Sequence, residues 1–574
     1  MAILASLLDC SGRRSLTRLC AASLLTCLAA AHAQTPPQTP PDAGALLRES
    51  RQQPTPPPQL PEVQAPRLLR DTGIKVQVRR FDIVGASRFD NAVLQARLTD
   101  LVGMELGFAQ LQAAADRIAA LYRDMGLHAA AVLPEQTLTD GVVRIIVIEG
   151  RLGVIKLESS VPAGRKLPLA LVERMLQTGQ VVGKVINTQA LERATLLANE
   201  LPGVRVSVIL TAGAQTGETD IVAKLDARPL LAGAGTLDNQ DARATGSAKI
   251  GLALSIASPL GFGDDAQLLA NASEGKHYLR AAFSLPLGAD GLRIAANVST
   301  MRYRLVGEFK ASGGEGRANT AGLALTYPLL RGVERNLYTS AVFDHQSLRN
   351  DSTAGNLSDK TADSLTLGLN GDSADQLGSG GVFIGGVQIG TGRINLDGNA
   401  ADLAADAAGP RRNGSFSKFS ANLGRLQRLS ADGSLWLSAS GQYAGKNLDS
   451  GQKFSLGGAN GVRAYPSLEG SGDHGWLATV EYRYRLADTL QLNLFYDHGQ
   501  VTRDRDPLPP AAGPLRYALK GAGVGLDWQV AGVGTLRALA ASRIGSNPSA
   551  GLDGRDSDGS KRRPQLWLSA SAPF

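Results

Sequence analysis

Cysteine is nearly absent from this chain of 574 residues, which contains only Cys10, Cys20 and Cys27. All three lie within residues 1–33, which read as a cleavable secretory signal. A mature chain that begins at Gln34 would have no cysteine, and this excludes disulfides, thiol catalysis and cysteine-ligated metal sites. The absence also suits a protein that crosses an oxidising compartment unfolded, where a stray thiol would be trapped.

The signal has the usual three parts. A charged segment with Arg13, Arg14 and Arg18 precedes the apolar run 19–30, and residues 31–33 (Ala-His-Ala) have the small-x-small pattern of a cleavage site. The run is too short to span a bilayer, and no stretch of about 20 apolar residues occurs elsewhere, so we expect no transmembrane helix in the mature chain. A membrane location would have to be carried by strands.

Signals for catalysis and for nucleic-acid binding are also lacking. The net charge of +7 includes the arginines of the signal, and no basic run is interleaved with aromatic residues. No Walker-type phosphate loop occurs, and Gly371-Asp372-Ser373 stands in Gly- and Ser-rich surroundings unlike a nucleophile elbow. The histidines of the mature chain form no His-x-x-x-His pair: His128, His277, His345, His474 and His498. We therefore predict no enzymatic activity, no metal and no cofactor.

Residues 34–73 are rich in proline, glutamine and threonine. They include the run Pro54-Thr55-Pro56-Pro57-Pro58, which is typical of an extended linker. Within this segment, residues 43–53 lack proline and could form a short helix. A disordered tail is an equally good interpretation of this composition.

Two consecutive segments, 74–150 and 151–227, predict α/β modules of the order β-α-α-β-β. In each, strand-like runs and helical spacing alternate, and glycine or Pro-Gly ends a helix. The first module is predicted to have a strand over 76–84, a helix around 111–122, and strands over 127–133 and 142–148. The second is predicted to have strands over 152–157, 204–210 and 219–225 and helices over 167–176 and 188–201.

From residue 228 to residue 574 the helical periodicity is replaced by alternation. Leu490, Leu492, Leu494 and Tyr496, for example, alternate with Gln491, Asn493, Phe495 and Asp497. A soluble sandwich would also alternate. A membrane barrel is favoured because charges lie at mid-strand on the polar face, as a wet lumen allows, and because connections alternate between short and long. The short connections are 487–489 and 531–534, and the long ones are about 451–475, 498–515 and 546–564.

The chain ends in a strand-like segment, 566–574, whose last residue is Phe574. Leu566, Leu568, Ala570, Ala572 and Phe574 share one face of this segment. A terminal aromatic residue on a lipid-facing strand is a familiar signal for membrane insertion. Such a barrel must close, because an unpaired strand edge cannot lie in lipid.

Residues 457–466 read Gly-Gly-Ala-Asn-Gly-Val-Arg-Ala-Tyr-Pro. This segment resembles the loop motif of two-partner secretion transporters, the haemolysin-activator and filamentous-haemagglutinin secretion class, in the superfamily that includes the Bam-type barrel insertases. Residue 464 is alanine where the family often has glycine. The first module matches this family in order as well, at residues 81–85, 121–127, 133–136, 140–141 and 149–150.

The resemblance implies a fold and a lock between a loop and the barrel wall. It implies a periplasmic helix and linker (34–73, with a possible short plug helix at about 43–53), two POTRA domains (74–150 and 151–227) and a sixteen-stranded antiparallel barrel (228–574) whose long loop 451–475 folds inward. It pairs the motif arginine, here Arg463, with the aspartate of a Phe-x-Asp-x-Gly segment, here Asp497. The alternation agrees, since Asp497 lies on the polar face and a carboxylate there needs a partner; the alternative is that Arg463 is a solvated loop charge.

The remaining predicted site residues follow from the same resemblance. They are the loop motif residues Gly457, Gly458, Asn460, Gly461, Val462, Tyr465 and Pro466; the lumen-wall residues Glu481, Phe495 and Gly499; Asp238 and Asn239, where the chain is expected to enter the barrel; and Phe574 as the insertion signal.

The function implied is export of one large secreted partner of the adhesin, haemagglutinin or haemolysin type. The POTRA domains, in the periplasm of a Gram-negative bacterium, would bind the unfolded partner by β-augmentation. The barrel would lie in outer-membrane lipid after insertion by the barrel assembly machinery, as a monomer or weak dimer. A barrel insertase is the main alternative, and a passive porin or receptor is a weaker one.

Overall fold

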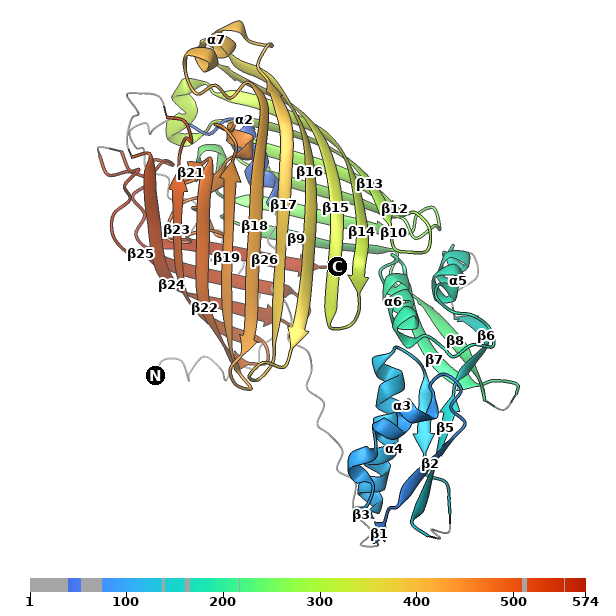
Figure 1. Cartoon of the computed structure of the whole chain (residues 1–574). Coiled ribbons are helices and arrows are strands. Elements are labelled where there is room, and N and C mark those ends of the chain that lie inside the picture. Colours follow the sequence, from blue (N-terminus) through green and yellow to red (C-terminus); the bar gives the residue numbers. More distant parts are fainter. Residues whose placement is uncertain are drawn as a thin grey trace, which may run out of the picture.

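The computed structural model describes residues 40–52, 75–136, 140–160, 166–215, 217–507, 514–551 and 553–574. The proposed signal and most of the Pro-rich linker lie outside these residues. A tall closed barrel forms one end of the molecule, and two small α/β modules lie below it (Figure 1). A short helix, α2 (Ala43–Arg51), lies inside the barrel although it precedes both modules in the sequence (Figure 1).

Sixteen antiparallel strands form the barrel, and the first strand, β9, pairs with the last, β26, to close it. The prediction of a sixteen-stranded antiparallel barrel is therefore confirmed, and no strand edge is left open to lipid. The strands are β9 (Leu231–Asp238), β10 (Lys249–Ala257), β11 (Asp265–Ser273), β12 (Lys276–Pro286), β13 (Arg293–Arg304), β14 (Glu315–Arg331), β15 (Arg335–Ser352), β16 (Gly355–Asp375), β17 (Gly381–Asn395), β18 (Gly414–Arg428), β19 (Gly433–Ala444), β22 (His474–Ala487), β23 (Leu490–Thr502), β24 (Arg516–Val530), β25 (Gly534–Arg543) and β26 (Gln565–Pro573).

The two faces of each strand differ in polarity as the alternation predicts. On β23, Leu494 and Tyr496 are 48% and 38% exposed, whereas Asn493 and Asp497 are 1% and 0% exposed. The first pair points outward to the lipid and the second into the lumen. No helix in the described part of the chain combines the length and apolar character that a transmembrane helix needs.

The connections between strands differ at the two ends of the barrel. Turns at the end nearer the modules are short, such as 488–489 and 531–533, and the connections at the far end include 445–473, 503–515 and 544–564. Strand β23 continues to Thr502, so the second long connection begins later than the predicted 498. Helix α7 (Ala400–Ala408) lies on a further long connection at the far end (Figure 1).

The first module contains a three-stranded sheet of order β2-β5-β4 covered by helices. Its helix α4 buries Ile118 and Tyr122 against the sheet. Its elements are β1 (Lys75–Gln77), β2 (Arg80–Val84), α3 (Asn91–Ala96), η2 (Thr99–Leu101), β3 (Glu105–Gly107), α4 (Phe108–Asp124), β4 (Ala129–Val132) and β5 (Val142–Glu149).

The single strand predicted over 76–84 is wrong. The chain changes partner at Val78 and Arg79, because β1 pairs with β3 whereas β2 pairs with β5. The amide of Val78 donates to the carbonyl of Met104 and the amide of Arg79 donates to Gly141. The short helix α3 was not predicted individually, since six residues carry too little periodicity to be recognised.

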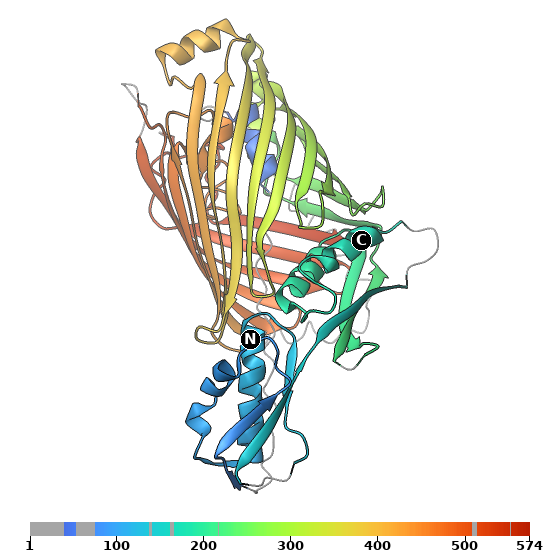
Figure 2. The ribbon, with the colours of Figure 1, turned by 45° about the vertical axis from the view of Figure 1, so that its right-hand side comes forward.

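The second module repeats the sheet order of the first, with β6 parallel to β8 and β7 antiparallel to it. Its elements are β6 (Arg151–Ser159), α5 (Leu169–Gln177), α6 (Thr188–Asn199), β7 (Val204–Ala212) and β8 (Glu218–Ala227). Helix α6 faces the turns of the barrel (Figure 2). Its Arg193 donates to the carbonyl of Pro328 at 2.7 Å, and its Glu192 accepts from the amide of Val333 at 2.8 Å.

The two modules share backbone hydrogen bonds at their junction. The amide of His128 donates to the carbonyl of Ile186 at 2.9 Å, and the amide of Thr188 donates to Gly126 at 2.7 Å. The N–H of Gly150, the last residue of the first module, donates to His128 at 3.0 Å. The junction is therefore a hydrogen-bonded extension of both sheets.

Glu149 holds the loop after β2 against helix α4. Its carboxylate accepts from the amides of Ser87 and Arg88, both at 2.8 Å, and from the hydroxyl of Tyr122 at 2.8 Å. Burial alone would raise the pKa of Glu149, but these hydrogen bonds together lower it. The stabilisation is therefore present above the unfolded carboxyl pKa and is lost as the pH falls through the lower, folded value.

We predict that Glu149→Gln destabilises the first module at neutral pH by about 1–3 kcal/mol, because the amide cannot accept all of these donors. Hydrogen exchange of α4 in the full-length protein measures the effect. Glu105→Gln, at an exposed position on β3, is the matched control. The difference in α4 exchange between the wild type and the Glu149→Gln variant should shrink as the pH falls below the ordinary glutamate range. Equal exchange in the Glu149→Gln and Glu105→Gln variants at neutral pH would contradict the role assigned to Glu149.

Candidate functional site

The connection 445–473 between β19 and β22, the eleventh and twelfth strands of the barrel, folds into the lumen. It begins earlier than the predicted 451 because β19 ends at Ala444. It contains a 3₁₀ turn, η5 (Ser450–Gln452), and a short hairpin of β20 (Phe454–Ser455) and β21 (Ser471–Gly472). Its tip, Gly457–Pro466, is mostly buried; Val462 and Tyr465 are 0% exposed.

The predicted motif glycines permit the close backbone approach at this tip. A Cβ atom on Gly461 would lie 1.9 Å from the carbonyl oxygen of Leu456, and one on Gly457 would lie 2.4 Å from that of Pro466. Gly458 has φ +113°, which other residues rarely adopt. Asn460, by contrast, is exposed at the tip.

Arg463 and Asp497 are brought together as the resemblance implied. The Nη2 and Nε atoms of Arg463 donate to the two carboxylate oxygens of Asp497 at 2.8 and 2.9 Å, and its amide donates to Oδ2 at 3.1 Å. Thr479 donates to the same carboxylate at 2.9 Å. The Asp497 side chain is fully buried and Arg463 is 8% exposed, so the interpretation of Arg463 as a solvated loop charge is wrong.

Three further wall residues contact Arg463, two of them at its guanidinium and one at its backbone. Its Nη1 donates to Glu481 on β22 at 2.5 Å, and its Cζ lies 3.4 Å from the centre of the Phe495 ring. The backbone carbonyl of Arg463 accepts from the indole of Trp567 on β26 at 2.8 Å. Contacts from β22, β23 and β26 therefore fix this one residue, and the predicted wall residues Glu481 and Phe495 are among them.

Small wall residues leave space for the loop. A Cβ atom on Gly521 would lie 2.5 Å from Cβ of Ala464 in the loop, whereas one on Gly523 would lie 2.5 Å from the ring of the wall residue Phe495, which covers Arg463. The predicted Gly499 has the same role, since its Cβ would lie 2.5 Å from Leu456. The alanine at 464 does not adopt a positive φ, so this departure from the family motif requires no backbone change.

The outer part of the loop is held by the connection 544–564. Glu469, which is fully buried, accepts from Nδ2 of Asn547 at 3.0 Å and from the hydroxyl of Ser557 at 2.7 Å. Burial raises the pKa of Glu469, and the hydrogen bonds oppose this change. Arg543 pairs with Asp556 and stacks on the ring of Tyr465 at 4.5 Å.

Helix α2 occupies the lumen beside this loop. Its buried side chains Leu46 and Leu47 pack in a cluster with wall residues such as Tyr303 and Leu348. At its first turn, the amide of Ala43 donates to Asn350 on β15 at 2.8 Å. The short helix predicted near 43–53 thus lies inside the barrel, over Ala43–Arg51.

Ion pairs connect both ends of α2 to the wall. At the N-terminus, Lys360 on β16 lies 3.2 Å from Asp42, which caps the helix. At the C-terminus, Glu49 pairs with Lys276 on β12 at 3.0 Å, and Arg51 pairs with Asp344 on β15 at 2.7 Å. All of these wall residues point into the lumen.

Asp42 remains ionised over a wide pH range. Burial by itself would raise its pKa, but the ammonium of Lys360 and hydrogen bonds from Ser450 and Ala45 lower the pKa to about 2. Because the pKa of this carboxyl is depressed, its contribution is present above the unfolded pKa and is lost only as the pH falls toward 2. Mild acidification is therefore not expected to detach the N-terminus of the helix.

Helix α2 also contacts the inward-folded loop directly. Arg48 donates to the carbonyls of Ser450 and Lys453, both at 2.7 Å. Lys360, which pairs with Asp42, also pairs with Asp449 of the loop at 2.6 Å. The buried Lys360 therefore contacts both helix α2 and the inward-folded loop.

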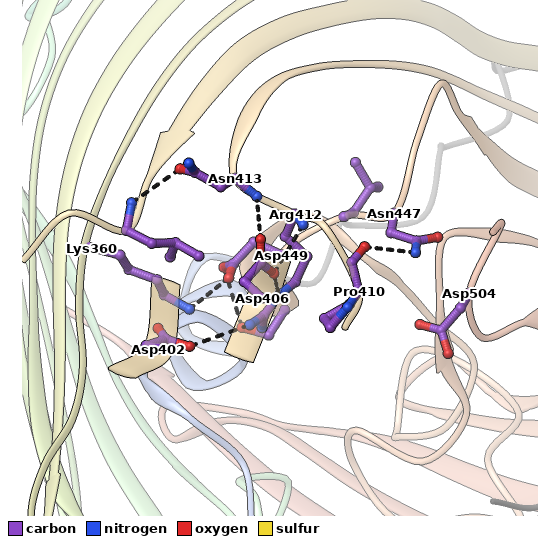
Figure 3. Close-up of polar contacts among 12 residues, drawn as sticks. Lys360, Asp402, Asp406, Pro410, Arg412, Asn413, Asn447, Asp449 and Asp504 are labelled. Atoms are coloured by element: carbon purple, nitrogen blue, oxygen red, sulfur yellow. Dashed lines mark hydrogen bonds and ion pairs between the residues drawn. The ribbon is translucent and has the colours of Figure 1, made fainter. Parts of the chain in front are cut away.

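Polar contacts around Lys360 and Asp449 join the connections at the far end of the barrel (Figure 3). On the α7 connection, Asp406 accepts from Nε of Arg412 at 2.8 Å and from the amide of Asn413 at 2.8 Å. Asn447, at the start of the inward loop, donates to the carbonyl of Pro410 at 2.8 Å. The α7 connection is thus joined to the base of the loop.

Two predictions concern the closing seam of the barrel. Asp238 and Asn239 do not lie at the module side, where the chain enters the barrel, so that expectation is wrong: β9 ends at Asp238 at the far end. Asn239 donates to Leu566 and accepts from Leu568, and so extends the pairing of β9 with β26. Phe574 is 63% exposed, and its backbone pairs with Gly233 on β9; its role as an insertion signal stays a prediction.

The lumen-facing cations Lys276 and Lys360 were not predicted. Each has its partners in distant segments, so no local spacing marks them. Alternation alone would have placed both on the lumen face. Across the residues that the structure describes, no group of three or more His, Cys, Asp or Glu side chains is arranged to hold a metal ion.

Comparison with known proteins gives a consistent result. The family model for haemolysin secretion/activation proteins ShlB/FhaC/HecB matches residues 217–528, and the model for the ShlB-type POTRA domain matches residues 76–150. The chain is similar to the heme/hemopexin transporter protein HuxB of Haemophilus influenzae strain 86-028NP, with 26% identity over 487 residues and 83% of each chain covered. It is also similar to the outer membrane transporter CdiB of Escherichia coli strain 536, with 27% identity and coverage of 77% of this chain and 76% of the relative.

A solved structure of CdiB from Escherichia coli has the same fold. It superimposes with a TM-score of 0.65 at 22% identity and covers 93% of this chain and 96% of that one.

We predict that Arg463→Ala releases the loop tip from the wall. Asp497 and Glu481 would be left buried without their cation, and this destabilises the docked loop by about 3–5 kcal/mol. No cysteine follows Cys27 in the sequence, so a Val462→Cys background adds the single thiol of the described residues and allows specific labelling of the tip. Thiol labelling at position 462 should become faster by about tenfold or more when Arg463→Ala is added. Arg485→Ala, which removes an exposed ion pair with Asp432, is the control; unchanged labelling of the Arg463 variant would contradict the anchoring role.

We predict that Lys360→Met frees α2, because two carboxylates would lose a shared buried cation. In a Leu47→Cys background, labelling of this position, which is 2% exposed in the wild type, should become several-fold faster. Lys310→Met, at an exposed lysine, should leave the rate unchanged. Lys360→Arg should preserve slow labelling; fast labelling in that variant would show that packing rather than charge holds the helix.

Proposed function

The chain belongs to the family of haemolysin secretion/activation proteins ShlB/FhaC/HecB, and from this premise we propose that it exports one large exoprotein that its periplasmic modules receive unfolded. It is an outer-membrane transporter, with the barrel in the membrane and the POTRA domain on the periplasmic side. The long connections, including the α7 connection, then face the outside of the cell.

The observation that carries the proposal is helix α2 inside the lumen. This helix belongs to the N-terminal segment that precedes the modules, yet hydrogen bonds and ion pairs attach both its ends to the barrel wall. A channel blocked by a separately tethered helix suits a transporter that opens for a polypeptide. A passive porin needs neither such a plug nor two periplasmic modules.

The partner is proposed to bind the modules as an extended chain. We infer that the second module, which repeats the sheet order of the first, is a second POTRA domain. Each sheet has two outer strands: β2 and β4 in the first module, and β6 and β7 in the second. A peptide that pairs with an outer strand gains main-chain hydrogen bonds that depend little on its sequence.

Passage through the barrel requires the lumen to open. Loop 445–473 and α2 fill it together, and both are attached through charged groups that can exchange their partners for water. We propose that arrival of the partner displaces α2 first, because α2, unlike loop 445–473, is not held between two strands of the barrel. The relatives named heme/hemopexin transporter and outer membrane transporter support a secretion role, and a partner of the adhesin, haemagglutinin or haemolysin type is proposed.

An outer-membrane insertase is the second candidate, because it shares this barrel fold. The plug helix and the family match favour secretion. We further propose that the protein is inserted by the barrel assembly machinery and works as a monomer or weak dimer.

We predict that deletion of residues 74–150 leaves a heat-modifiable barrel but abolishes partner export, because the first receiving sheet is lost. The partner gene is co-expressed, and the medium is assayed for its product. A variant with Glu105→Gln in the intact module is the control and should export normally. Full secretion by the deletion variant would show that the first module is only a spacer, and retained heat-modifiability distinguishes lost export from failed insertion.

A further inference from the structure

Arginines stand directly opposite one another on the outer, lipid-facing surface of the barrel. In the register of the sheet, His277 on β12 faces Arg302 on β13, Arg302 faces Arg317 on β14, and Arg317 faces Arg349 on β15. Arg302 and Arg317 are exposed, and the alternation of their strands points them away from the lumen. The three arginines, called the cationic row here, and the neighbouring His277 lie near the extracellular ends of their strands.

Like charges directly opposite each other destabilise a sheet. Among the described residues, the close ion pairs of the row lie at one end, where Arg349 is 2.9 Å from Asp351 and 3.6 Å from Asp359; Arg317 has the longer-range attraction of Asp351. Arg302 and Arg317 are left facing each other. An anion placed between them would relieve this repulsion.

An apolar groove of about 500 Å³ begins at the same row. Its floor consists of the small side chains of Ala270 and Ala272 on β11. Leu252 on β10 and Leu279 on β12 form its sides, and both are exposed to the membrane. Arg302 and His277 line its extracellular end. The groove therefore runs from a cationic end toward the middle of the membrane.

We propose that this groove and the cationic row bind lipid A, the phosphorylated and acylated anchor of lipopolysaccharide in the outer leaflet. One acyl chain lies on the alanine floor, and a phosphate lies between Arg302 and Arg317, where planar guanidinium groups donate paired hydrogen bonds. The position near the extracellular strand ends matches the leaflet in which this lipid resides. The charge of the row matches its phosphates, and the groove matches its chains.

The row would otherwise be unfavourable in this location. A lipid-facing surface is expected to be apolar, and arginine there becomes more costly with depth in the membrane. At the interface the cost is small, and a bound phosphate converts it into an attraction. Elsewhere on this half of the barrel, Arg393 on β17 faces Asp363 on β16, so its charge has a partner within the sheet.

Native mass spectrometry of the full-length protein in detergent tests the proposal. The probes are bis-phosphorylated lipid A, the same lipid A without phosphates, phosphatidylglycerol and inorganic phosphate. Wild-type protein should retain bis-phosphorylated lipid A, and the double change Arg302→Gln and Arg317→Gln should weaken retention by roughly tenfold or more. Ala272→Leu, which fills the groove floor, should have a comparable effect.

Matched controls separate this site from general lipid contact. Arg393→Gln removes one outward arginine, and Ala281→Leu enlarges an exposed outward alanine on β12; both should bind like the wild type. Equal retention of the lipid without phosphates, equal competition by phosphatidylglycerol or inorganic phosphate, or unchanged binding by the Arg302 and Arg317 variant would overturn the proposal. Heat-modifiability of each variant confirms that the barrel is folded.

Discussion

The burial of one guanidinium, that of Arg463, is the constraint on which the arrangement of the lumen depends. Removing an arginine and two carboxylates from water is costly, and only close geometry compensates for the cost. Here Asp497 supplies two oxygens to Arg463, Glu481 supplies a third, and the Phe495 ring covers the guanidinium face. The loop tip therefore has one well-defined position on the wall. Because water can replace each of these partners, the same contact can also be broken without unfolding the barrel.

Helix α2 is held by a different balance. Ala43, Leu46 and Leu47 provide its apolar contacts, and charged groups at both ends add ion pairs. A longer apolar face would make the helix a permanent part of the core. The ion pairs fix the position of the helix, and Lys360 places it next to the loop that carries Arg463. The proposed opening of the lumen would have to break these ion pairs and also the apolar contacts of Leu46 and Leu47.

The outer surface of the barrel differs from the lumen in where charged side chains lie. Most outward side chains are apolar because lipid cannot satisfy charge, and the arginines of the cationic row lie where the strands leave the membrane interior. The barrel thus uses buried charge on its inside to hold movable parts, and interfacial charge on its outside to meet the anionic leaflet. The strand alternation allows one sequence to carry both patterns, since neighbouring residues face different solvents.

The sequence by itself determined the barrel, the polar and apolar faces of its strands, and the two modules. It could do so because alternation, loop length and helical spacing are local patterns. The same alternation placed Asp497 on the lumen face, and the loop motif identified Arg463 as its expected partner. Local patterns could not divide 76–84 between β1 and β2, since the change of partner at Val78 depends on β3 and β5. They could not locate α2 either, because its partners Lys276, Asp344 and Lys360 lie more than two hundred residues away. Only the tertiary structure decided that this helix lies in the lumen, because closure of the sheet sets which distant residues become neighbours. The pairing of Arg302 with Arg317 was likewise decided by the register of β13 against β14.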